Sequence, residues 1–114
     1  MRCTASCVGG AAGDLVAVKI IPGAPPTLAA AWCASSGGSG SPIVTSTDGH
    51  SNVVVWVVAA EGSGLLKGFD GDTGATVFAG GATPIPGVRR FNVPIAAKGR
   101  FFVAADNTVV AFMP

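Results

Sequence analysis

Charged side chains are scarce in this chain. Lys, Arg, Asp and Glu make up 11% of its 114 residues, whereas ordinary soluble domains carry roughly 25%. The formal net charge of +1 gives no electrostatic reason to expect a nucleic acid or an anionic membrane surface as a partner. So low a charge content indicates sheets that pack on both faces and leave few faces in solvent.

Long apolar runs are absent as well. The longest covers residues 53–60, and a membrane-spanning helix needs about 18, so the sequence predicts no membrane span. The opening stretch MRCTASCVGG lacks the apolar core of a signal peptide. It predicts either a cytoplasmic protein or a natural chain that begins upstream of Met1.

Cysteine and histidine are few, with three and one respectively. The spacing of Cys3 and Cys7 matches neither a redox motif nor a zinc knuckle, and Cys33 stands alone. A zinc site would need all three cysteines and His50, which the spacing does not favour. A bridge between Cys3 and Cys7, or from one of them to Cys33, would need an oxidising compartment, and free thiols are the default prediction.

Short β-prone runs separated by turn residues fill most of the chain. Its 17 glycines and 8 prolines fall mostly between these runs and act as turn punctuation. The length allows one domain at most. We predict an all-β chain of nine strands without a helix, with strands over 15–21, 28–34, 42–47, 53–60, 65–69 and 75–79 and three more in the C-terminal quarter.

One strand pattern occurs three times. The stretch GLLKGFDGDTG at 64–74 shares its strand portion with DLVAVK at 14–19 and NTVVAFM at 107–113. Superposition aligns Leu15 with Leu66 and Val109, Ala17 with Gly68 and Ala111, Val18 with Phe69 and Phe112, and Trp32 with Phe78. The copies are spaced roughly 40–50 residues apart in the sequence, and repeats at such a spacing are typical of architectures built from one supersecondary unit.

A second set of similarities extends the repeat. Pro94-Ile95 matches Pro42-Ile43, and the Val-Ala-Ala-Asp run at 103–106 matches the Val-Ala-Ala-Glu run at 58–61. Between these points the later copy is nine residues shorter, seven from the first turn and two from the second. The differences are confined to turns, as expected for copies of one structural unit.

These patterns divide the chain into parts. Residues 1–13 are predicted to be a flexible lead-in, 14–34 the last two strands of one unit, 41–80 a complete four-stranded antiparallel unit in meander order, and 91–114 the first three strands of another. The stretch SSGGSGS at 35–41 is predicted to be a loop between adjacent sheets, because too few residues precede it for an independent core. Antiparallel four-stranded units that are apolar on both faces are the blades of β-propellers.

The motif of the central unit resembles the repeat of pyrroloquinoline-quinone-like β-propellers. It stands here as Gly64, Leu66, Gly68, Phe69, Asp70, Thr73, Gly74 and Phe78, with Phe78 in place of the usual Trp. The first copy keeps Trp32 but has Lys19 where Asp is expected. The resemblance implies a partial propeller of about two blades from the C-terminal part of a longer protein, periplasmic or extracellular like its relatives.

Members of that family that oxidise alcohols or sugars hold the quinone and Ca²⁺ at the propeller axis, with residues from six to eight blades. None of those residues can be placed on this chain by motif. We therefore predict no catalytic, cofactor-binding or metal-binding residue, and quinone with calcium enters only if the chain is a fragment of a quinoprotein dehydrogenase.

Local candidates for chemistry have simpler explanations. The Asp70–Gly74 turn superficially resembles a calcium loop, but it offers only the carboxylates of Asp70 and Asp72, with Gly81 at the twelfth position where an EF-hand has Glu. A hairpin turn in which Asp70 accepts backbone N–H groups and Gly74 has positive φ is favoured.

The remaining candidates are weaker still. His50 beside Ser51 is predicted to be an exposed turn histidine, since neighbours in one turn cannot form a hydrolytic triad. The glycines at 37–40 lack the Lys-Ser/Thr of a phosphate loop. Arg89 and Arg90, with Phe91 beside them, are predicted to lie at a solvated sheet edge, and Trp32 and Trp56 in the core or between sheets.

The sequence thus favours a non-catalytic propeller segment that serves as a scaffold or a protein-interaction module. Its expected partners are the remaining blades of a longer propeller or further copies of the chain, so we expect it not to be a self-sufficient monomer. The alternatives are a quinoprotein dehydrogenase fragment and a small all-β domain that binds carbohydrate or a surface through its turns.

Overall fold

The chain is all-β, as predicted. The computed structural model describes residues 13–114, and the part of the predicted lead-in at 1–12 lies outside them. The described residues form nine strands and no helix, and hence no helix that could cross a membrane. The strands are β1 (Leu15–Ile21), β2 (Thr27–Ala34), β3 (Ile43–Thr45), β4 (Val54–Val58), β5 (Leu66–Asp70), β6 (Thr76–Phe78), β7 (Ile95–Ala97), β8 (Arg100–Ala105) and β9 (Thr108–Phe112).

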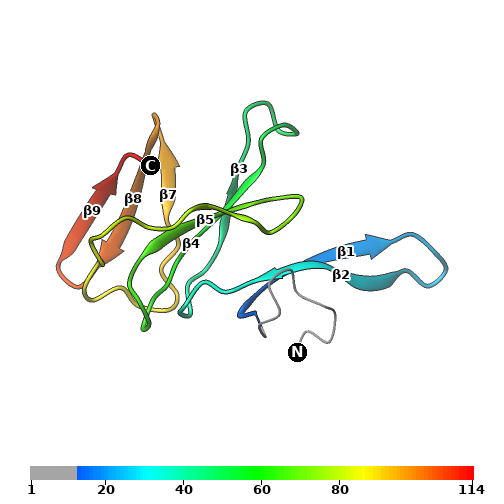
Figure 1. Ribbon diagram of the computed structural model, residues 1–114, viewed down its shortest axis with the longest axis horizontal. Helices are drawn as coiled ribbons and strands as arrows, with labels where there is room; N and C mark the ends of the chain where they lie inside the picture. The colour runs from blue at the N-terminus through cyan, green and yellow to red at the C-terminus, as the bar shows by residue number, and fades with distance from the viewer. Residues whose placement is uncertain (1–12) are drawn as a thin grey trace.

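The strands form three antiparallel sheets (Figure 1). The N-terminal sheet contains β1 and β2, the central sheet has the order β3-β4-β5-β6, and the C-terminal sheet has the order β7-β8-β9. The predicted four-stranded meander within 41–80 is therefore confirmed, with strand ends that differ by one or two residues. The two, four and three strands also match the strand numbers that the repeat predicts.

The C-terminal sheet repeats the central sheet pair by pair. Ile95 opposite Phe102 corresponds to Ile43 opposite Trp56, and Phe102 opposite Ala111 corresponds to Trp56 opposite Gly68. The same correspondence continues along the strands to the last pair, where Ala104 opposite Val109 corresponds to Val58 opposite Leu66. The two sheets therefore share one register over three strands, and the superposition of Leu66 on Val109 and of Gly68 on Ala111 is confirmed.

The N-terminal sheet repeats the other half of the same unit. Ala17 lies opposite Trp32, and Gly68 lies opposite Phe78. A β-bulge follows at once in both sheets, after Ala17 in one and after Gly68 in the other. Because a bulge adds one residue to one strand and bends it, its recurrence at the same position indicates that the two hairpins are copies of one structure.

One sequence match is displaced by a residue. The Val-Ala-Ala similarity aligns Val58 with Val103, but the ladder places Val103 opposite Val110 in the position where Val57 lies opposite Lys67. The C-terminal sheet is nine residues shorter than the central sheet over this part, and the ladder places six of these residues in the first turn and three in the second. The β3–β4 connection at 46–53 shrinks to Lys98-Gly99, and the β4–β5 turn loses the other three residues.

Each sheet has a front face and a back face, and the shared register places equivalent residues on the same face in all three sheets. The front face carries Ala17 and Trp32 in the N-terminal sheet, Trp56 and Gly68 in the central sheet, and Phe102 and Ala111 in the C-terminal sheet, because paired residues lie on the same side. Residues of the other alternation, such as Phe69 and Phe101, form the back faces.

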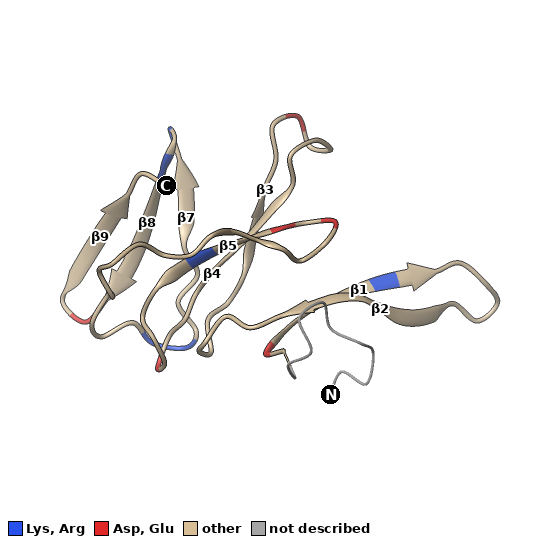
Figure 2. Ribbon diagram, in the orientation of Figure 1, with Lys and Arg blue, Asp and Glu red and all other residues tan. Residues whose placement is uncertain are grey.

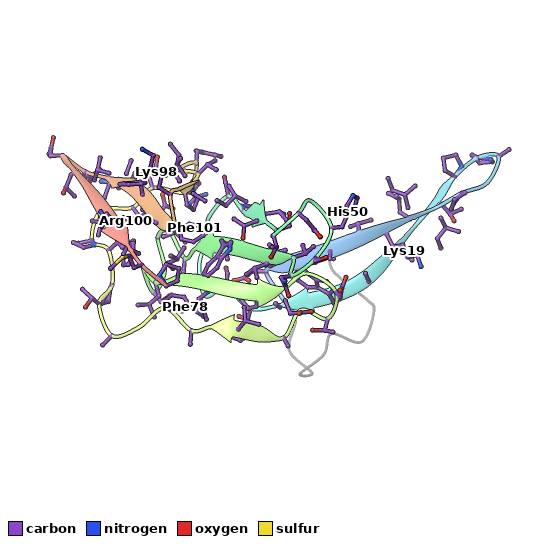
Figure 3. All side chains as sticks on the ribbon, turned by 90° about the horizontal axis from the view of Figure 1, so that it is seen from above. Lys19, His50, Phe78, Lys98, Arg100 and Phe101 are labelled. Atoms are coloured by element: carbon purple, nitrogen blue, oxygen red, sulfur yellow. The ribbon has the colours of Figure 1, made fainter. Side chains whose placement is uncertain are left out.

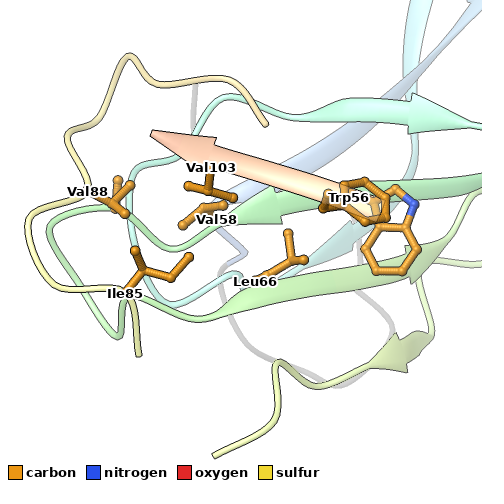
Figure 4. Close-up of a cluster of buried hydrophobic side chains, with 8 residues drawn as sticks. Trp56, Val58, Leu66, Ile85, Val88 and Val103 are labelled. Carbon is orange, nitrogen blue, oxygen red and sulfur yellow. The ribbon is translucent and has the colours of Figure 1, made fainter. Parts of the chain in front are cut away.

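The sheets stack front to back. The front of the N-terminal sheet packs Trp32 against Val57 and Phe69 on the back of the central sheet. The front of the central sheet packs Trp56, Val58 and Leu66 against Phe101 and Val103 on the back of the C-terminal sheet (Figure 4). The central sheet is therefore covered on both faces, as its doubly apolar strand 53–60 predicts.

The glycine-rich segment 35–41 is a close-packed loop between sheets. A Cβ on Gly40 would lie 1.7 Å from the carbonyl oxygen of Val58, and one on Gly38 would lie 2.4 Å from the carbonyl carbon of Ala59. Ser39 N–H donates to the Ala60 carbonyl at 2.8 Å. The loop prediction is confirmed, and the glycines are required because the loop backbone lies directly against β4 and the turn after it.

The β1–β2 hairpin extends beyond the length of the repeat. Lys19 stands where Asp70 begins its turn, and the ladder continues through Lys19, Ile20 and Ile21. This extension projects from the body of the molecule in Figures 1 and 3, where Lys19 is labelled. It contributes to the long axis of a molecule that measures 48 × 31 × 24 Å.

Candidate interaction surface

The front face of the C-terminal sheet is mainly apolar and bare, with Arg100 at one end of it. Val109 is 67% exposed, whereas Leu66, its counterpart in the central sheet, is 1% exposed. Ile95 is 64% exposed, whereas its counterpart Ile43 packs against the core. Residues that form a buried interface on the front of the central sheet therefore have apolar counterparts on the C-terminal sheet that no other sheet covers.

Strand β9 is an edge with little protection against further pairing. Among residues 13–114 it pairs with β8 alone. It carries no charged side chain, and charges elsewhere lie mainly in turns and at strand ends (Figure 2). Natural edge strands are usually protected by charges, Pro or bulges, so this edge can accept another strand.

Trp32 shows how the repeat closes the junction between two sheets. Its indole Nε1–H donates to the Gly71 carbonyl at 2.8 Å. A Cβ on Gly74 would lie 2.6 Å from Cε3 of the same indole. The Asp70–Gly74 turn of the central sheet is therefore shaped to receive an aromatic residue from the preceding sheet, and Gly74 has to be glycine for the indole to fit.

The carboxylate of Asp70 is occupied by its own turn. It accepts hydrogen bonds from the N–H groups of Asp72 and Thr73 and from the Thr73 hydroxyl, at 3.1, 2.8 and 2.8 Å. The Thr73 hydroxyl, followed by the Thr73 N–H, lowers the pKa of Asp70. With Gly74 at φ 74°, the predicted hairpin turn is confirmed, and no group of three metal-ligating side chains occurs within 13–114.

His50 and Ser51 lie in the exposed β3–β4 turn, as predicted. The carboxylate of Asp48 accepts the N–H of His50 at 2.8 Å and the hydroxyl of Ser51 at 2.8 Å. The Ser51 N–H, followed by that of His50, lowers the pKa of Asp48. These groups therefore satisfy a local turn, and their hydrogen bonds explain its shape without any catalytic arrangement.

Arg89 and Arg90 are exposed, as predicted, but their predicted place at a sheet edge is wrong. They lie in the connection between β6 and β7, and each pairs with a carboxylate on a different sheet. Arg89 contacts Asp106 at 2.5 Å in the β8–β9 turn, and Arg90 contacts Glu61 in the β4–β5 turn. The arginines therefore tie the connection to two neighbouring turns, and Phe91 beside them is exposed.

A groove of about 450 Å³ lies where the N-terminal sheet meets the glycine-rich loop. Its walls include Asp14, Ser36 and Arg90, but these groups are already engaged. The Asp14 carboxylate accepts the N–H groups of Ser36 at 2.5 Å and Gly37 at 3.0 Å. Burial opposes ionisation of Asp14, but these N–H donors outweigh it and lower its pKa. The groove is therefore part of a sheet junction.

The prediction of free thiols is wrong for Cys33. This residue is buried and disulfide-bonded, and the other cysteines, Cys3 and Cys7, lie outside the described residues.

Trp32 and Trp56 are both buried, which confirms their place in the core or between sheets. Sequence reasoning predicted bare apolar faces on an open stack but did not identify the residues of the front face, although the alignment of Val109 with Leu66 indicated one of them.

Comparisons with protein-family models, with curated proteins and with solved structures found no match to this chain.

Proposed function

We propose that this chain is a non-catalytic segment of a pyrroloquinoline-quinone-like β-propeller that acts as a scaffold and protein-interaction module. The observation that supports this proposal is the register shared by the three sheets, together with their front-to-back stacking. Sheets of one repeated unit that stack in one sense are what propeller blades require. The engaged carboxylates of Asp14, Asp48 and Asp70 give no support to a catalytic role.

The partner is the back face of another sheet of the same repeat. Within the chain, every covered front face meets such a back face. The front of the C-terminal sheet is bare, and the back of the N-terminal sheet exposes Val18, Ile20 and Leu28 in the part beyond the bulge, whereas Cys33 on the same face is buried. A front-to-back contact is heterologous, so it continues from copy to copy until a ring closes. The chain associates either with further blades of a longer propeller or with itself.

The disulfide at Cys33 supports a place for this chain in an oxidising compartment. Disulfides persist in secreted and periplasmic proteins and are rare in the reducing cytosol. This agrees with the periplasmic or extracellular location that the family resemblance implies.

Light scattering coupled to size exclusion tests the proposal. The wild-type chain should form species larger than 11.1 kDa whose mass rises with concentration. Ile95→Lys places a charge at an exposed position on the bare front face, so it should shift the mass toward the monomer without loss of folded structure.

Val44→Lys is the matched control. Val44 is 62% exposed on the back face of β3, and Ile95 is 64% exposed on the front face of β7. The control should leave the mass of the wild-type species unchanged. A cleanly monomeric wild-type chain with cooperative unfolding would contradict the proposal and would indicate a small self-sufficient β domain.

A further inference from the structure

The outer part of the β1–β2 hairpin is exposed and apolar on both faces. Residues 18–29 are all exposed. On the back face Ile20 pairs with Leu28, and these side chains are 68% and 65% exposed. On the front face Ile21 pairs with Thr27. This part of the chain is therefore a projecting hairpin with apolar side chains on either side, and not a sheet with a single open face.

Charge is confined to the base of this outer part. Lys19 is the only charged residue within 18–30, and Figures 2 and 3 show the hairpin continuing beyond it, away from the rest of the molecule. The turn at 22–26 contains three prolines, which have no N–H group. An apolar environment around the turn would therefore leave few backbone donors unsatisfied.

Stacking on a second copy of the chain does not account for the outermost residues. In the central sheet the last pair of β4 and β5 is Val54 opposite Asp70, and Lys19 holds the position of Asp70. Ile20 and Leu28 lie beyond that position. A stacked sheet with the dimensions of the central sheet therefore ends before them, and they need a different partner.

We infer that residues 20–28, the hairpin tip, insert into the interface of a lipid bilayer. A bilayer surrounds a projecting hairpin on both faces, whereas a partner sheet covers only one. Lys19 at the base lies level with the lipid phosphates, whose negative charge it complements. This binding surface is additional to the front and back faces of the proposed function.

The dimensions of the hairpin tip fit this placement. At about 3.3 Å per residue, the strand ends and the turn reach roughly 10 Å beyond Lys19. Interfacial elements bury their apolar side chains about 5–10 Å into the boundary between headgroups and acyl chains. The outward backbone groups of a two-stranded ribbon need water or headgroups as hydrogen-bond partners, which limits insertion to this boundary.

Cosedimentation of the full Ile95→Lys chain with phosphatidylcholine vesicles tests the inference. That background removes front-face association, so a failure here is distinct from a failure of the proposed function. The chain should partition onto the vesicles. A rise in NaCl from about 0.05 to about 0.5 M should change the partition coefficient less than about twofold, because salt screens charges and leaves apolar insertion in place.

The double variant Ile20→Thr/Leu28→Thr removes apolar surface from the hairpin tip and adds no charge. It should lower the partition coefficient at least about tenfold, because two apolar side chains lose their transfer from water. Val44→Thr is the matched control, because Val44 is similarly exposed but lies on the central sheet. It should partition like its parent, and circular dichroism should show the same fold for all three chains.

A spin-labelled lipid in phosphatidylcholine nanodiscs measures the placement directly on the parent chain. Amides of residues 20–28 should broaden most, and those of β4 and β5 should not broaden. Absence of partitioning, equal partitioning of the double variant and Val44→Thr, or broadening centred on another strand would overturn the inference. So would binding that requires phosphatidylserine, or amide shifts at 20–28 that grow with protein concentration without lipid, since the partner would then be a charged surface or a protein.

Discussion

At the scale of single residues, Trp56 and Gly68 explain why the repeat alternates large and small side chains. A Cβ on Gly68 would lie 2.9 Å from the six-membered ring of Trp56. The ring also lies 4.4 Å from that of Phe101 and 5.8 Å from that of Phe78, measured between centroids. Its Nε1–H donates to the Thr45 hydroxyl at 2.8 Å, so the polar atom of this buried ring is satisfied.

Trp56→Ala should lower the free energy of unfolding by about 3–5 kcal/mol, the range for a large aromatic lost from a core. Trp56 is 8% exposed and contacts both its own sheet and the next one, so little of the cavity can collapse. Urea denaturation followed by circular dichroism measures the change in midpoint and slope.

Phe102→Ala is the control for that experiment, because Phe102 holds the register position of Trp56 in the C-terminal sheet. Its front face is bare, so truncation should cost clearly less than truncation of Trp56. Equal losses for the two variants would show that the front face of the C-terminal sheet is covered in solution.

Asp14 links the N-terminal sheet to the glycine-rich loop and makes stability depend on pH. Its folded-state pKa lies below the ordinary value of 3.8, so its ionised form stabilises the fold above that pH. The contribution is lost as the pH falls through the folded-state pKa. Asp14→Asn should therefore destabilise the chain at pH 7 by about 1 kcal/mol, at the low end for hydrogen bonds to charged groups because the site is partly solvated.

The difference between wild type and Asp14→Asn should shrink as the pH is lowered from 6 to 3, as measured by thermal unfolding. Asp72→Asn removes a carboxylate from an exposed turn and serves as the control. A difference in stability between wild type and Asp14→Asn that stays constant down to pH 3 would mean that the ionised Asp14 carboxylate does not stabilise the glycine-rich loop.

At the scale of elements, the sequence predicted the strands and their partners but not every register. The small and aromatic residues of the repeat aligned Ala17 with Gly68 and Trp32 with Phe78 correctly, because in both sheets the small residue lies opposite the aromatic residue at the pair next to the bulge. The Val-Ala-Ala match predicted an alignment of β4 with β8 that is wrong by one residue. Both copies are apolar on both faces, so identity of letters there does not define which face a valine occupies.

The candidate surface was harder to predict than the fold. Whether an apolar residue such as Val109 is buried depends on which sheet lies above it, and a single copy of the motif does not contain that information. The role of Arg89 and Arg90 depends on turns that are distant in sequence, where Asp106 and Glu61 lie. Local patterns therefore define strands and turns, and only the assembled sheets define which faces remain open.

The β3–β4 connection offers a test of the repeat at this scale. Replacement of residues 46–53 by the Lys-Gly turn that joins β7 to β8 should leave the central sheet intact, because the flanking pairs Thr45–Val54 and Ala97–Arg100 correspond. The change removes the hydrogen bond from Gly71 N–H to the Val53 carbonyl but shortens the loop. We expect a stability change within about 1 kcal/mol.

Thermal unfolding and far-ultraviolet circular dichroism measure that change. A reversed swap, with residues 46–53 placed between β7 and β8, is the control and should also fold. Loss of the folded spectrum in the first variant would mean that the long turn is part of the central sheet's structure and that the two sheets are not interchangeable.

At the scale of the whole molecule, the three sheets differ in how many of their faces are covered. The central sheet is packed on both sides by the two apolar clusters. The N-terminal and C-terminal sheets are each packed on one side by these clusters, and the opposite faces expose Ile20 and Leu28 on one and Ile95 and Val109 on the other. Local stability should follow this order, because resistance to local opening grows with buried apolar contacts.

Hydrogen exchange measured by NMR on the Ile95→Lys variant should therefore show a gradient along the stack. Amides of β4 and β5 should exchange only through global unfolding, because these strands are central in the sheet and buried on both faces. The outer part of the β1–β2 hairpin, beyond the bulge, and the edge strand β9 should exchange through local opening at much lower free energy. In the wild-type chain, higher concentration should raise the protection of β7–β9 and of the β1–β2 hairpin and leave β4 and β5 unchanged, because front-to-back association covers the front of the C-terminal sheet and the back of the N-terminal sheet. Uniform protection across all three sheets at every concentration would contradict both the gradient and the open face from which it follows.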